Sequence, residues 1–187
     1  MNLSSYAELA VRLANTAVLA DGEADPLDGV EACAETFGDC LAGKVTRRDL
    51  TVLAYLRNEF TAIFTAAATG EDRAAVEGLN RLLVQFPIQP ELASHDDQRW
   101  HVHLASQGSA SDQFAAGAII GLALTVSLYG VSRLGICAIA SCPRVFLDSS
   151  PNTSRRYCAE HGSHGNVSTL RTSSSAVLPG RTTTAAS

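Results

Sequence analysis

One uncharged stretch decides the fold: residues 113–132, which read QFAAGAIIGLALTVSLYGVS. Twenty such residues are long enough to cross a bilayer. However, glycine, threonine, serine and glutamine interrupt the stretch, and much of its apolar content is alanine. The charges just before it, at Asp96, Asp97 and Arg99, are also unlike a membrane flank. We therefore predict that the stretch is the core helix of a helical domain and not a membrane span.

The segments before this stretch predict four amphipathic helices. Their apolar residues recur at spacings of three and four, which places them on one face of each helix. Thr46 followed by Asp49 is typical of a capping box and marks the start of the strongest helix. The expected boundaries are Ser4 or Ser5 to about Leu19, Pro26 to Gly38, Thr46 to Gly70, and Gly70 to Pro87. Helices that bury a shared face form a bundle, so the predicted fold class is mainly α.

In residues 91–105 the apolar side chains recur every second residue, and no longer every 3.6 residues, which predicts a β-hairpin beside the helices. In its second half, apolar Trp100, Val102 and Leu104 alternate with His101 and His103. We expect the apolar side chains to lie against the helices and the two histidines to share the opposite face. A His-x-His pair can bind a metal, with His95 as the nearest third ligand, but a solvated hairpin face is the preferred interpretation.

The charge of the chain is unevenly distributed. Residues 1–132 hold eight basic and 17 acidic side chains, which gives a net charge of −9. Residues 133–187 hold six arginines and two acidic side chains, which gives a net charge of +4. A basic end on an acidic body favours contact with a polyanion. The same distribution also fits a solubilised body with scattered surface arginines.

Several classes of protein are disfavoured. Five cysteines in 187 residues are too few for a disulfide-stapled scaffold. The N-terminus, MNLSSYAELAVRLANTAVLADGE, has neither a basic start nor a long apolar core, so we expect no secretory signal and a cytoplasmic location. The sequence has no glycine-rich phosphate loop, nucleophile elbow or His-Glu-x-x-His motif, and we therefore do not expect an enzyme.

Three of the cysteines, Cys137, Cys142 and Cys158, lie close together in a segment too short and too rich in serine and glycine to build its own core. Four residues separate the first two and fifteen separate the second from the third, and such intervals are common in small zinc modules. A tetrahedral zinc needs a fourth ligand, which either His161 or His164 can supply. The pattern predicts a Cys₃His zinc site that stabilises the segment.

The stretch RLGICAIASCPRVFLDSSPNTSRRYC, at residues 133–158, resembles the CGNR zinc finger. In that family the finger ends bacterial proteins whose larger N-terminal part is an ABATE domain. AVRLANT at residues 10–16, and PEL followed by RWHVHL within residues 90–104, are similar to that domain. The resemblance covers about residues 8–171, and it implies a stress-induced transcription regulator.

The resemblance also implies site residues. Cys137, Cys142 and Cys158 match the first three zinc ligands of the family. The Cys-Gly-Asn-Arg motif that names the family corresponds here to HGNV at residues 164–167. A histidine therefore has to replace the fourth cysteine, and both His161 and His164 remain candidates.

The polar residues around the predicted ligands are candidates for nucleic-acid contact. Arg155 and Arg156 directly precede Cys158, and Arg171 follows it, so all three arginines can meet phosphates. Asn166 can hydrogen-bond an adenine edge. We predict a zinc-dependent DNA-binding regulator whose helical body senses a signal or forms a homodimer.

The predicted domains are a helical body at residues 1–132, a finger at 133–171 and a disordered low-complexity tail at 172–187. Two other functions fit the same sequence. One is a zinc-stapled protein-interaction module without DNA contact, and the other is a helical ligand-binding domain with a decayed finger.

Overall fold

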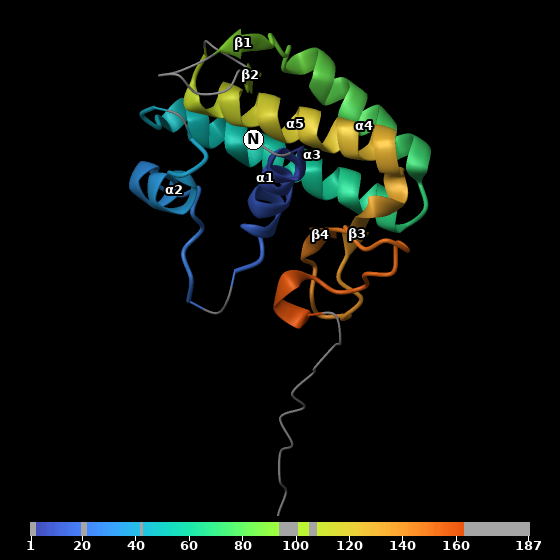
Figure 1. Cartoon of the computed structure of the whole chain (residues 1–187). Helices are drawn as coiled ribbons and strands as arrows, with labels where there is room; N and C mark the ends of the chain where they lie inside the picture. The colour runs from blue at the N-terminus through green and yellow to red at the C-terminus, as the bar shows by residue number, and fades with distance from the viewer. Residues whose placement is uncertain (1–2, 20–21, 42, 94–100, 105–107, 163–187) are drawn as a thin grey trace, which may run out of the picture.

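The computed structural model describes residues 3–19, 22–41, 43–93, 101–104 and 108–162. In these residues, five α-helices surround one core and short strands form two separate antiparallel pairs (Figure 1). The helices are α1 (Leu3–Asn15), α2 (Val30–Phe37), α3 (Arg47–Ala68), α4 (Asp72–Gln85) and α5 (Ala110–Tyr129). The strands are β1 (Glu91–Ala93), β2 (His101–His103), β3 (Leu134–Ile136) and β4 (Val145–Leu147), with the 3₁₀ turns η1 (Val131–Arg133) and η2 (Ala159–His161). The predicted mainly α fold with a hairpin and a small C-terminal module is confirmed.

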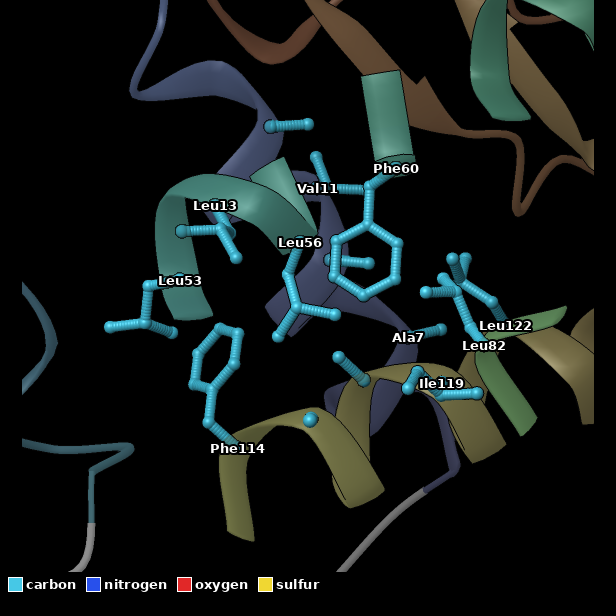
Figure 2. Close-up of a cluster of buried hydrophobic side chains, with 14 of the residues drawn as sticks. Ala7, Val11, Leu13, Leu53, Leu56, Phe60, Leu82, Phe114, Ile119 and Leu122 are labelled. Atoms are coloured by element: carbon cyan, nitrogen blue, oxygen red, sulfur yellow. The ribbon is translucent and has the colours of Figure 1, made fainter. Parts of the chain in front are cut away.

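The core lies where α1, α3 and α5 meet. Figure 2 shows Phe60 and Leu56 of α3 facing Phe114 of α5, with side chains of α1 and α4 around them. The ring of Phe114 also meets the ring of Phe37 of α2 edge to face, at 5.7 Å between centroids. Each fully buried side chain of this size contributes about 1.5–3 kcal/mol to stability, so this cluster holds the helices together.

Glycines allow α1 and α5 to cross closely. A Cβ on Gly121 would lie 2.3 Å from the backbone nitrogen of Ala7, whereas a Cβ on Gly117 would lie 3.0 Å from the Cδ1 atom of Tyr6. The first of these contacts is with backbone that cannot rotate away, so only glycine fits there. Two of the glycines that interrupt the uncharged stretch, Gly117 and Gly121, therefore serve helix packing inside the protein.

The starts of α3 and α5 are tied together by one carboxylate. The capping box of Thr46 and Asp49 begins α3 as predicted. Asp49 is buried, and its second oxygen accepts hydrogen bonds from the backbone nitrogen and Oγ of Ser111, at 3.0 and 2.8 Å. A second capping box, of Ser109 and Asp112, begins α5 and was not recognised in the sequence. Burial raises the pKa of Asp49, but the hydrogen bonds outweigh burial and lower it.

Three predicted helix boundaries were wrong: both ends of α1 and the start of α2. Helix α1 already includes Leu3 and ends at Asn15, so Ser4 and Ser5 lie inside it and do not cap it. Helix α2 starts at Val30 and not at Pro26. The reason is a turn before α2, in which the carboxylate of Asp25 accepts a hydrogen bond from the backbone nitrogen of Leu27, and both of its oxygens accept from the Nη1 atom of Arg57. The backbone at this point forms the turn in place of a helical turn, so the helix begins only after it.

The β1–β2 hairpin forms with Leu92 opposite Val102. These two side chains are 65% and 46% exposed, so the prediction that Val102 packs against the helices was wrong. Both residues of this pair lie on one face of the sheet because they are directly opposite, and that face is turned to solvent. Leu104, just past β2, is half-buried. Trp100 and His95, and the side chains of His101 and His103, lie outside the described part of the chain.

Helix α5 is the predicted core helix, although only its first half is enclosed. Most of its residues are buried as far as Leu122, whereas Leu124, Leu128 and Tyr129 are exposed. Among the described residues, α5 is the one helix long and apolar enough to span a membrane, and half of its most apolar window is buried inside the protein. Its packing against α1, α3 and α4 is that of a core helix.

Candidate metal centre

The β3–β4 hairpin positions the first two cysteines. Cys137 directly follows β3, and its backbone nitrogen donates to the carbonyl of Arg144 just before β4, at 2.9 Å. Between them the chain makes a tight turn, in which the backbone nitrogen of Cys142 donates to the carbonyl of Ile139, also at 2.9 Å. The four-residue interval between the cysteines is therefore the length of this turn, and it directs both sulfurs to the same side.

The other two donors come from η2. Cys158 precedes this 3₁₀ turn, and its carbonyl accepts from the backbone nitrogens of His161 and Gly162, at 3.3 and 3.1 Å. Gly162 has φ +64°, a conformation that favours glycine and ends the turn. The backbone nitrogen of Ala138 donates to the carbonyl of Arg156 at 2.8 Å, which holds this segment against the β3–β4 turn.

Together these elements bring Cys137, Cys142, Cys158 and His161 into one cluster, whose four ligand atoms all lie within 4.8 Å of one another. The Nδ1 atom of His161 is 3.3 Å from the sulfurs of both Cys137 and Cys158, and the sulfurs of Cys142 and Cys158 are 3.9 Å apart. A tetrahedral zinc with ordinary bond lengths requires about 3.8 Å between sulfurs and about 3.5 Å between sulfur and nitrogen. The donor set therefore fits zinc.

Cys137 and Cys142 differ in pKa because their surroundings differ. Burial raises the pKa of Cys137, but hydrogen bonds from the backbone of Cys158 and Ile139 and from His161 bring it down to about 7. Burial, together with the neighbouring sulfurs, raises the pKa of Cys142 to about 11. Zinc ligands are thiolates, so the Cys137 sulfur deprotonates more readily than the Cys142 sulfur, which needs a cation beside it.

Asp148 shapes the connector between β4 and Cys158. It is buried, and its carboxylate accepts from the backbone nitrogens of Ser150 and Arg155, at 2.7 and 3.0 Å. The guanidinium of Arg133 lies 3.9 Å away. Burial raises the pKa of Asp148, and these partners lower it further than burial raises it. The sequence gave no sign that a buried carboxylate organises this connector.

Three of the four finger arginines that the structure describes are engaged by other groups of the protein. Arg155, a predicted phosphate contact, donates to the carbonyls of Tyr157 and Leu147 at 2.9 and 3.2 Å and lies over the ring of Phe146 at 5.1 Å. Its donors therefore stabilise the finger.

Arg133 donates to the carbonyls of Asp148 and Ser150, and Arg144 lies 3.4 Å from Glu160. Among the described arginines of the finger, Arg156 alone differs: it is exposed, and its side chain makes no hydrogen bond or ion pair with any residue in the described ranges. His164, Asn166 and Arg171 lie outside the described residues.

The finger is joined to the helical body by polar and apolar contacts. At the end of α1, the side chain of Asn15 donates to the carbonyl of Val145 at 3.0 Å and accepts from its backbone nitrogen at 2.8 Å. Leu134, Val145 and Leu147 are buried in the same core cluster as the helices. Figure 1 shows this hairpin beyond the end of α5, next to α1 and α3. The finger is thus docked on the body and is not a freely hinged appendage.

Comparison with known proteins agrees with this architecture. Residues 133–172 match the family model of the CGNR zinc finger, and the cluster of three cysteines and one histidine lies within them. The protein binds zinc. Residues 7–128 match the ABATE model, described as "Putative stress-induced transcription regulator". No curated protein matches the chain. The resemblance seen in the sequence is therefore confirmed, and the chain belongs to the ABATE family, with a CGNR zinc finger after its helical body.

Proposed function

We propose that the protein is a cytoplasmic, zinc-dependent regulator that binds DNA through its finger, while its helical body senses a signal or forms a homodimer. The observation that supports DNA contact most directly is the state of Arg156. Its backbone carbonyl is fixed by Ala138, one residue after a zinc ligand, and its side chain is exposed and unpaired within the described residues. A cation held at a fixed position in this way is suited to a phosphate.

Zinc has a structural role in this proposal. Cys137, Cys142, Cys158 and His161 supply four ligands, and a zinc with four protein ligands has no open position for a substrate. The ion would hold the β3–β4 turn and η2 together, and with them the backbone that carries Arg156. Loss of zinc should therefore abolish DNA contact by unfolding this surface.

The distribution of charge limits the size of the DNA contact. The body carries a net charge of −9 and repels a polyanion. Arg133, Arg144 and Arg155 are engaged inside the finger. Arg156 and the predicted contacts Arg171 and Asn166 then carry the interaction, so we expect modest affinity with a shallow dependence on salt.

Fluorescence anisotropy with a labelled duplex and the full-length zinc-loaded protein tests this proposal. Arg156→Ala should weaken binding severalfold and reduce the slope of log K against log salt by about 0.9. Arg73→Ala is the matched control, because Arg73 lies on α4 and is 92% exposed. The proposed DNA contact is refuted if the protein does not bind duplex DNA at low salt, or if Arg156→Ala and Arg73→Ala bind it with the same affinity. The inward-facing arginines would then favour a zinc-stapled protein-interaction module.

A further inference from the structure

A cavity of about 440 Å³ lies at the start of α5, at the opposite end of this helix from the finger. It opens between the start of α3, the end of α4 and the start of α5, and this volume is in the range of small-molecule sites. The residues that matter for its chemistry are Arg48, Val52, Gln85, Phe86, Pro87 and Asp112. The zinc cluster and the proposed DNA contact use none of them.

Two hydrogen-bond donors that line this cavity have no acceptor among the residues that the structure describes. Arg48 makes no hydrogen bond or ion pair with any described residue. Gln85 accepts a hydrogen bond from the hydroxyl of Tyr55 at 2.7 Å through its Oε1 atom, so its Nε2 group is left as a donor. Asp112 also lines the cavity but makes no ion pair with Arg48; its Oδ2 atom accepts hydrogen bonds from the backbone nitrogen and Oγ of Ser109, at 3.0 and 2.8 Å.

The lining also has an apolar wall with an aromatic ring, and Gln89 is a further polar residue beside it. Val52, Phe86 and Pro87 form the apolar wall. The ring of Phe86 is stacked on that of Tyr55, with centroids 6.4 Å apart and planes at 30°. Since Tyr55 is held by Gln85, the orientation of the Phe86 ring and that of the free Gln85 donor are set by the same contacts. A ligand with an aromatic ring and an adjacent acceptor group would match both.

We propose that this cavity binds a small aromatic carboxylate, whose ring packs on Phe86 and Val52 and whose carboxylate accepts hydrogen bonds from Arg48 and Gln85. A carboxylate fits better than a neutral acceptor because a guanidinium forms its strongest contacts with anions. The inference does not depend on DNA binding. It gives the helical body a site where a signal can act, connected to the finger by α5.

The test is titration of the full-length zinc-loaded protein with 2-naphthoate, followed by ¹H–¹⁵N spectra. The amide shifts of Arg48, Val52 and Phe86 should saturate together. Arg48→Gln should weaken binding about tenfold or more, as expected for the loss of a charge-assisted contact. Gln85→Glu keeps an acceptor for Tyr55 but turns the free donor into an anion, so it should weaken binding as well.

Arg47→Gln is the matched control, because Arg47 is the exposed neighbour of Arg48 and does not line the cavity. This variant should bind 2-naphthoate within about twofold of the unmodified protein. The uncharged analogue 2-naphthylmethanol should bind at least about tenfold more weakly than 2-naphthoate. The proposal is overturned if 2-naphthoate gives no saturable shifts at the cavity, if Arg48→Gln and Arg47→Gln are equivalent, or if the alcohol binds as tightly as the carboxylate.

Discussion

Asn15 joins the finger to the body through two hydrogen bonds to Val145, and Asn15→Ala tests how much that junction contributes. Each bond contributes about 1 kcal/mol net, and part of the cost of leaving the Val145 backbone without partners adds to this. Val145 is 2% exposed, so water cannot readily replace the lost contacts. We expect a loss of about 3 kcal/mol in the free energy of unfolding.

Urea unfolding at saturating zinc, followed by circular dichroism, measures this loss. With a urea dependence of about 2 kcal/mol per molar, the midpoint should fall by about 1.5 M with no change in slope. Body and finger share a core, so one transition is expected. Asn80→Ala on the surface of α4 is the control and should change stability by less than about 0.5 kcal/mol. If Asn15→Ala is as mild as this control, or produces a separate early transition of the finger, the docking described above is incorrect.

Three further results are expected. In a competition with a chromogenic chelator, His161→Ala should lower the affinity for zinc at least about tenfold, whereas His164→Ala should leave it unchanged. The reverse result would place the fourth ligand outside the described cluster. Folding lowers the pKa of Asp49, so its carboxylate stabilises the protein fully above the unfolded-state pKa of about 4 and progressively less below it. The difference in free energy of unfolding between the unmodified protein and Asp49→Asn should therefore decrease as the pH falls below about 4, and a difference that stays unchanged down to pH 2 would contradict this. Gly121→Ala should lower the thermal midpoint far more than Gly117→Ala, because its new methyl meets backbone of α1 and not side chains; equal effects would contradict the close crossing.

Sequence reasoning succeeded where the interacting residues are near one another in the chain. Thr46 and Asp49 are three positions apart and form the predicted capping box. Cys137 and Cys142 span one turn, so their interval already indicated a shared metal. In both cases the local backbone alone brings the groups together, and residue type with spacing describes that geometry.

Contacts between distant segments could not be predicted in this way. Asp49 reaches Ser111, 62 positions away, and Asn15 reaches Val145, 130 positions away. A capping motif in the sequence identifies the residue that caps its own helix, but it does not show which other helix that residue also contacts. The orientation of the β1–β2 hairpin was missed for the same reason: alternation shows that two faces differ, but the packing of the whole body decides which face is covered.

The arginines show a further limit of prediction from sequence. Their number gave the C-terminal third a positive charge, and that suggested a phosphate-binding surface. Whether a guanidinium points outward depends on nearby carbonyls and rings, such as those that hold Arg155. Residue counts along the chain carry no such information, so Arg155 and Arg156, adjacent in sequence, have opposite surroundings.

The apolar strip formed by Leu134, Val145 and Leu147 has a practical consequence for protein engineering. These residues form part of the finger, but they are covered by helices of the body. A finger grafted onto an unrelated host would expose all three to water and tend to aggregate, and a body truncated after Tyr129 would expose the matching surface. The chimaeras expected to remain soluble are those that exchange the finger together with its receiving surface on α1 and α3.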